Sequence, residues 1–157
     1  FTSLTPESVV NETMELALIQ AEKLNARINT TIEPNLPAMN GDSVMLEQLL
    51  LNLLKNAMEA VQPCPNHTID LDVRLHESGS FIQFRVADHG TGIPDDAKTM
   101  LFDAFYSTKD EGMGMGLNIC RSIVEVHHGR IVISDTPGGG ATFTFTVPVA
   151  REHPDLM

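Results

Sequence analysis

Apolar side chains recur at helical spacing in three stretches of the chain. The spacing predicts amphipathic helices over residues 6–25, 43–61 and 117–127, because apolar residues three and four positions apart share one face of a helix. Thr5-Pro6 is typical of a helix start, since proline suits the first helical position. Three helices of ordinary length are therefore expected.

Other stretches alternate apolar and polar residues, as half-buried strands do. Strands are expected over residues 28–33, 69–75, 82–86, 130–134 and 143–147. Residues 89–116 are rich in glycine and lack periodicity, so they are expected to form a long irregular segment with a short helix near 96–102. The order of these elements favours an α+β fold with helices on one face of a mostly antiparallel sheet.

Composition narrows the class of protein. The 157 residues are 42% hydrophobic, which suits one domain with its own core. A net charge of −11 without a basic cluster argues against a nucleic-acid partner. The apolar run Leu49–Leu51 is broken at Asn52, so neither a membrane span nor direct membrane contact is expected. Cys64 and Cys120 have no metal-ligand spacing, and with no secretory signal the chain is expected to be cytoplasmic.

The second helix carries a polar face beside its apolar stripe. Asn52, Asn56 and Glu59 stand at positions i, i+4 and i+7 and therefore share this face. One interpretation is a solvent-exposed face. The other is that Asn56 offers a neutral oxygen to Mg²⁺, which takes oxygen ligands together with water and substrate phosphates.

The segment 88–94 reads Asp-His-Gly-Thr-Gly-Ile-Pro and follows an expected strand. A buried carboxylate at Asp88 could accept a hydrogen bond from the amino group of adenine, which would select adenine over guanine. Gly90 and Gly92 would let a flat base pack against the backbone. The alternative is a capped turn, since Asp-x-Gly is common turn chemistry.

Glycine occupies every second position of the run Gly112–Gly116, immediately before an expected helix. Such a run fits a phosphate site at a helix N-terminus, and it equally fits a plain hinge. The phosphate-binding loop G-x-x-x-x-G-K-[ST] is absent, the spacing is not that of a Rossmann fingerprint, and no eukaryotic-type protein kinase motif is present.

Five motifs in a fixed order resemble the ATP-binding catalytic domain of bacterial two-component sensor histidine kinases. That domain belongs to a superfamily shared with DNA gyrase, MutL and a heat-shock chaperone. The motifs are an N box at 52–57, a G1 box at 88–92, an F box at 101–105, a G2 box at 112–116 and a final glycine–strand element at 139–143.

The resemblance implies a two-layer α/β sandwich of the Bergerat type, with a mixed, mostly antiparallel sheet and three helices on one face. It implies ATP and Mg²⁺ as cofactors, with Asn56 as metal ligand, Asn52 near the phosphates and Asp88 on adenine. The region 95–111 would be the ATP lid. The residues it places in catalysis or around nucleotide and metal are Asn52, Lys55, Asn56, Asp88, Gly90, Gly92, Ile93, Phe102, Lys109, Gly112, Gly114, Met115, Gly116, Leu117 and Thr142.

Position 52 separates reactions within this superfamily. Relatives that hydrolyse ATP, such as gyrase and MutL, carry glutamate there as the general base, and the mitochondrial ketoacid dehydrogenase kinases carry glutamate there too. This chain has Asn52, and an amide cannot take a proton from water at neutral pH. Transfer of the γ-phosphoryl group to a histidine is therefore expected. The alternatives are an ATPase clamp of the gyrase–MutL type and a degenerate nucleotide-binding interaction module.

The resemblance also implies partners outside this sequence. His76 is followed by Glu77 but not by the Asn/Thr-Pro of a phosphoacceptor helix, and no other histidine has that context. We expect a catalytic domain over 1–150, whose residues 1–30 follow a missing dimerisation and phosphoacceptor domain, and a polar tail over 151–157. The fragment is expected to be monomeric, to act on its own acceptor domain and, indirectly, on a response-regulator receiver domain.

Overall fold

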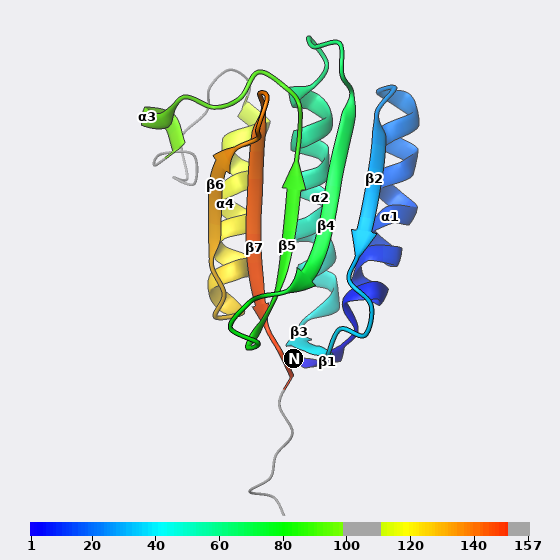
Figure 1. Cartoon of the computed structure of the whole chain (residues 1–157), viewed down its shortest axis with the longest axis vertical. Helices are drawn as coiled ribbons and strands as arrows, with labels where there is room; N and C mark the ends of the chain where they lie inside the picture. Colours follow the sequence, from blue (N-terminus) through cyan, green and yellow to red (C-terminus); the bar gives the residue numbers. More distant parts are fainter. Residues whose placement is uncertain (99–110, 151–157) are drawn as a thin grey trace, which may run out of the picture.

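The computed structural model describes residues 1–98 and 111–150, including their side chains except those of residues 111–115. Within these ranges a five-stranded sheet forms one layer, and helices α1, α2 and α4 cover one of its faces (Figure 1). The elements are β1 (Thr2–Leu4), α1 (Pro6–Lys23), β2 (Arg27–Ile32), β3 (Met39–Gly41), α2 (Ser43–Ala60), β4 (Thr68–Leu75), β5 (Phe81–Ala87), α3 (Asp95–Lys98), α4 (Glu111–Val126), β6 (Ile131–Asp135) and β7 (Ala141–Pro148).

The sheet is mixed and mostly antiparallel, which confirms the expected α+β sandwich. Its strand order is β2-β4-β5-β7-β6. The edge strand β2 runs parallel to β4, and every other neighbouring pair is antiparallel. Strands β1 and β3 form a separate two-stranded sheet that the sequence did not predict, because three residues are too few to show a period of two.

The first two helices begin at side-chain caps. The Thr5 hydroxyl accepts the Ser8 N–H at 3.2 Å, and proline follows at the first helical position, as predicted. The Asp42 carboxylate accepts the Met45 N–H at 2.9 Å and caps α2. Each cap satisfies a backbone donor that the first helical turn leaves without a partner.

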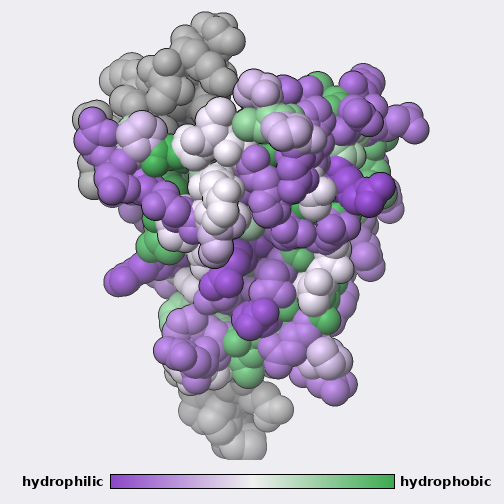
Figure 2. Space-filling model, turned by 45° about the horizontal axis from the view of Figure 1, so that its top comes forward, coloured by the Kyte–Doolittle hydropathy of each residue, from purple (hydrophilic) through white to green (hydrophobic). Residues whose placement is uncertain are grey.

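The core lies between the sheet and the helices. Phe84 of β5 stacks on Phe145 of β7, with ring centroids 4.7 Å apart. Helix α2 is buried along its leucines, whereas Leu16 and Ile19 of α1 follow helical spacing yet are 59% and 57% exposed. Hydrophilic residues dominate the face shown in Figure 2, with apolar residues in scattered patches. No helix of the described residues has the length and apolar character needed to cross a membrane.

Helix α4 begins at Glu111, whereas the sequence analysis placed its start near Leu117. Met113 stands four residues before Leu117, so the apolar spacing of the helix continues upstream through the glycine run. Glycine weakens a helix interior by about 1 kcal/mol relative to alanine but does not prevent it. The expectation of an irregular segment reaching residue 116 was therefore wrong.

The end of α4 depends on two adjacent residues with different roles. His128 takes the left-handed conformation, with φ of 62°, and its N–H bonds to Glu125 O at 3.0 Å. The Gly129 N–H reaches Val124 O at 3.0 Å, which completes a Schellman motif. A Cβ at Gly129 would lie 1.8 Å from Thr146 O, so glycine is required there by the neighbouring strand and not by its own φ.

We expect Gly129→Ala to lower the free energy of unfolding by about 3 kcal/mol, because the added Cβ would overlap a backbone oxygen of β7. Gly79→Ala is the matched control: its φ is 79° but its Cβ would meet nothing within 4 Å, so it should cost about 1 kcal/mol of conformational strain. Urea unfolding of both variants measures the difference. Equal losses would show that close approach to β7 is not what requires glycine at 129.

Candidate functional site

The most deeply buried carboxylate of the described residues lies at the end of strand β5. Asp88 is 2% exposed. Its Oδ1 accepts the Gly90 N–H at 2.9 Å and the Ala141 N–H at 3.1 Å. Its Oδ2 accepts no hydrogen bond from the part of the chain that the structure describes, so one oxygen is fixed by backbone donors while the other is available.

Burial and hydrogen bonding act on Asp88 in opposite directions. Desolvation is the larger effect and raises the pKa of this carboxyl above its ordinary value. The Gly90 and Ala141 N–H groups and the nearby His89 lower the pKa by smaller amounts. The Nε2 of His89 also lies 3.2 Å from Oδ2 of Asp70 on β4.

Glycines bring three backbone segments together around Asp88. A Cβ at Gly90 would lie 2.5 Å from Ala60 O, so the loop after β5 packs directly on the end of α2. A Cβ at Gly140 would lie 2.0 Å from Asp88 O, so the turn before β7 approaches Asp88 equally closely. Gly92 has φ of 80° and faces Gly140. Contact with the backbone of α2 thus explains why residue 90 is glycine, whereas the sequence predicted contact with a nucleotide base.

Asn56 lies one helical turn before Ala60 on α2, on the side that the loop after β5 approaches. Its Nδ2 is buried and has no hydrogen-bond partner among the described residues. An unsatisfied buried amide costs about 1–3 kcal/mol, so such a group points to a ligand or to atoms outside the described ranges.

The side chain of Asn52 lies close to the thiol of Cys120 on α4. Burial raises the pKa of that thiol to about 12, and the nearby amide of Asn52 opposes this increase by a smaller amount. Cys120 Sγ also lies 4.0 Å from Leu49 O. The thiol is therefore an unreactive packing group, and Asn52 connects the polar face of α2 to α4.

The glycine run lies within the first two turns of α4. A helix leaves the N–H groups of its first turn without intrahelical partners, and with a start at Glu111 that turn contains Gly112. Gly114 and Gly116 lie further along the helix, beyond the backbone N–H groups that its first turn leaves without partners. A Cβ at Gly116 would meet nothing within 4 Å, whereas Leu117 is fully buried.

The remaining expected contacts divide into three groups. Ile93 packs against the core, and Lys55 is exposed on α2. Thr142 is buried, but it lies on the face of β7 opposite to that of Phe143, and its hydroxyl pairs with Thr136 at 2.9 Å. Phe102 and Lys109 lie outside the described residues, as does the side chain of Met115.

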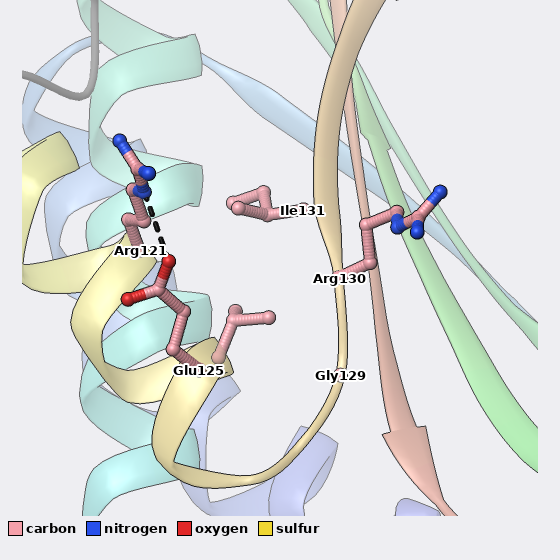
Figure 3. A pocket seen from close by; sticks show the side chains of 6 residues that line it. Arg121, Glu125, Gly129, Arg130 and Ile131 are labelled. Carbon is pink, nitrogen blue, oxygen red and sulfur yellow. Dashed lines mark hydrogen bonds and ion pairs between the residues drawn. The ribbon is translucent and has the colours of Figure 1, made fainter.

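Two cavities border these elements. One of about 460 Å³ lies between the loop after β5 and the turn before β7, and it is lined by Thr91, Gly92, Ile93, Pro94, Asp135, Thr136, Gly139 and Gly140. The other, of about 330 Å³, lies between α4 and β6 (Figure 3). There Arg121 pairs with Glu125 at 3.0 Å, and none of the residues expected to bind nucleotide lines it.

Sequence reasoning undervalued the segment 136–141. The motif at 139–143 was expected only as a final glycine–strand element, whereas in the structure the turn supplies the Ala141 N–H to Asp88. The available signal was the run of three consecutive glycines, since a two-residue hairpin turn needs positive φ at two positions at most. In the structure all three have positive φ, at 89°, 118° and 118°. Periodicity could not show which carboxylate the turn would contact.

The arrangement of these groups fits a nucleotide. The free Asp88 oxygen suits an amino group, and the unpartnered Asn56 amide suits a polar ligand atom. The start of α4 suits phosphate. The fold and the site therefore define a nucleotide-binding α/β sandwich.

Comparison with known proteins gives the family. Residues 41–151 match the model of the histidine kinase-, DNA gyrase B- and HSP90-like ATPases. The chain belongs to this family and, within it, to the ATP-binding catalytic domains of sensor histidine kinases.

Relatives and solved structures agree with this assignment. The chain is 42% identical over 150 residues to the C4-dicarboxylate transport sensor protein DctS of Rhodobacter capsulatus, covering 96% of this chain and 23% of DctS. It is 36% identical over 145 residues to the sensor protein FixL of Bradyrhizobium diazoefficiens, covering 92% of this chain and 28% of FixL. The chain thus spans about a quarter of the length of these relatives.

The fold is shared with histidine kinases of known structure. The catalytic domain of ThkA superposes with a TM-score of 0.83 at 26% identity, covering 96% of this chain and 98% of ThkA. Full-length ShkA in complex with AMPPNP gives a TM-score of 0.83 at 27% identity, covering 98% of this chain and 32% of ShkA.

We expect Asp88→Asn to unfold at a higher urea concentration than the unaltered chain at neutral pH. The pKa of Asp88 is higher in the folded state than in the unfolded state. At a pH between these two pKa values the native state therefore binds more protons than the unfolded state. The Asp88 carboxyl therefore lowers the free energy of unfolding as the pH rises from 3.8, the ordinary pKa of aspartate, through the higher pKa of Asp88 in the folded state. The variant lacks this cost.

Urea unfolding of both proteins from pH 3.5 to pH 8 measures the effect, and the advantage of Asp88→Asn should increase with pH. Asp72→Asn removes the same charge from the exposed side of β4 and serves as the control. A difference between Asp88→Asn and the unaltered chain that decreases as pH rises would contradict burial as the dominant influence on Asp88.

Proposed function

We propose that this chain binds ATP with Mg²⁺ and transfers the γ-phosphoryl group of ATP to a histidine on a separate dimerisation domain of the same protein. The observation that carries the proposal is the buried Asp88, whose Oδ1 is held by two backbone N–H groups while Oδ2 accepts no hydrogen bond from the described residues. A carboxylate fixed in this way can accept a hydrogen bond from the amino group of adenine, which guanine does not offer at the same position.

Asn56 and the start of α4 are the proposed contacts for the metal and the phosphates. The buried amide of Asn56 has a donor without a partner, which supports a ligand contact at this residue. Bound Mg²⁺ would neutralise charge on the phosphates. The first turn of α4 would add backbone N–H groups and the positive end of the helix dipole.

The proposed reaction is phosphoryl transfer with positioning as the main contribution of the protein. A bond forms between a histidine ring nitrogen of the acceptor domain and the γ-phosphorus, while the bond from that phosphorus to its bridging oxygen breaks and ADP leaves. Asn52 supports transfer over hydrolysis, because its amide cannot take a proton from water at neutral pH.

The relatives are about four times as long as this chain, which supports the proposal that further domains belong to the same protein. The catalytic domain spans residues 1–150, with residues 151–157 as a tail outside the described residues. The histidine substrate and the dimer contacts are on another domain, and a response-regulator receiver domain takes the phosphoryl group afterwards. The domain works as a monomer on the cytoplasmic side of the cell.

Calorimetry should show that the chain binds a non-hydrolysable ATP analogue with Mg²⁺ and binds the guanine analogue at least tenfold more weakly. Asp88→Asn should weaken binding of the adenine analogue by about tenfold or more, since a hydrogen bond to a charged group contributes about 1.5–3 kcal/mol. Asp72→Asn should leave the affinity unchanged. No binding at millimolar nucleotide would overturn the proposal.

The transfer step is tested by adding the histidine-bearing dimerisation domain in trans with labelled ATP. Acid-labile phosphate on that domain, but not on this chain, is the expected result. Steady release of inorganic phosphate without labelling of the acceptor would instead favour an ATPase clamp.

We expect Gly116→Ala to weaken ATP binding by about tenfold while raising the free energy of unfolding by about 0.5–1 kcal/mol. Neither positive φ nor protein packing among the described residues requires glycine at this position, which leaves close approach of a ligand as its reason. Ser122→Ala, on an exposed position further along α4, is the control for helix propensity. Unchanged affinity in Gly116→Ala would remove this turn of α4 from the site.

A further inference from the structure

Two buried threonines face each other across the turn between β6 and β7. Thr136 follows β6 and Thr142 lies in β7, with exposed fractions of 7% and 6%. Their hydroxyl oxygens are 2.9 Å apart. A buried hydroxyl without a partner is costly, so this pair satisfies two groups at once and links the two sides of the turn.

Thr136 also closes the turn through its backbone. The Thr136 N–H donates to Gly140 O at 3.0 Å, and Thr136 O accepts the Gly139 N–H at 2.9 Å. The turn between them contains three glycines with positive φ, and glycine has more backbone freedom than any other residue. The turn therefore depends on the bonds of Thr136 for its shape.

The far end of this turn holds Asp88. The Asp88 N–H donates to Ala141 O at 3.0 Å, and the Ala141 N–H donates to Asp88 Oδ1 at 3.1 Å. Gly140 approaches so closely that a Cβ there would lie 2.0 Å from Asp88 O. A small change in the shape of the turn would thus change the hydrogen bond that orients the carboxylate.

We propose that Thr136 is a positioning residue for base recognition: its hydroxyl bond to Thr142 holds the turn 136–140 in the shape that fixes Asp88 Oδ1 and leaves Oδ2 free for the amino group of adenine. Thr136 touches neither Asp88 nor, in this proposal, the nucleotide. It acts through Thr142, Gly140 and Ala141. The inference rests on the proposed function, because it assigns to Thr136 a part in selecting adenine over guanine.

Three variants test the inference. Thr136→Val keeps the branched shape but removes the hydroxyl, Thr136→Ser keeps the hydroxyl, and Thr144→Val removes a hydroxyl from the same face of β7 two residues beyond Thr142. Thr136→Val should reduce the preference for the adenine over the guanine analogue roughly three- to tenfold in calorimetry with Mg²⁺. The other two variants should keep the preference of the unaltered chain within twofold.

A second readout needs no nucleotide. The Ala141 N–H lowers the pKa of Asp88, so a looser turn should let that pKa rise. Carbon-13 NMR titration of the Asp88 carboxyl should therefore give a higher pKa in Thr136→Val than in the unaltered chain, with Thr136→Ser restoring the original value. A purely structural role would lower the melting temperature without moving this titration.

The outcomes separate the two proposals. If the unaltered chain prefers adenine while Thr136→Val leaves both the preference and the Asp88 titration unchanged, the inference is overturned and the proposed function stands. If the unaltered chain binds both nucleotides equally or binds neither, the proposed function is overturned, and the role of Thr136 in base recognition is overturned with it.

Discussion

The buried carboxylate of Asp88 is the constraint around which this end of the molecule is arranged. A carboxylate taken out of water must find hydrogen-bond donors, and here they come from the loop after β5 and from the turn before β7. Both segments reach it because glycine allows backbone to approach backbone. The cost of burying one charge thus fixes the relative positions of two loops more than fifty residues apart in the chain.

Helix α2 connects the surroundings of Asp88 to the layer of helices. Its end meets the loop after β5 at Gly90, and its polar face meets α4 where Asn52 contacts Cys120. At the opposite end of the same layer, buried His127 accepts the Asp42 N–H at 3.1 Å and donates to Ile123 O at 2.8 Å. Helices α2 and α4 are therefore joined near their middles and again where the start of α2 meets the end of α4.

Periodicity predicted the elements of this fold well where they are long. The helices α1 and α2 and the hairpin β4–β5 lie within a few residues of their expected bounds, because each presents an apolar face to one core. The short β1–β3 pair was missed, and the start of α4 was displaced, since glycines obscured a helical spacing that continues through Met113. Exposed Leu16 and Ile19 show that spacing predicts a helix more reliably than it predicts burial.

The site was predictable in its motifs but not in the roles of its glycines. Sequence reasoning placed Asp88 at a strand end and Asn56 on a polar helix face, and both are found there. It assigned Gly90 to the ligand, whereas Gly90 makes room for α2, and it did not predict that the turn 136–140 orients Asp88. A glycine is required wherever anything comes close, and a sequence does not say whether that neighbour is a ligand or the protein itself. Only the structure distinguishes a glycine that faces a ligand from one that faces protein. The contacts that decide this join Asp88 to Ala141 and Gly90 to Ala60, across segments that share no sequence pattern.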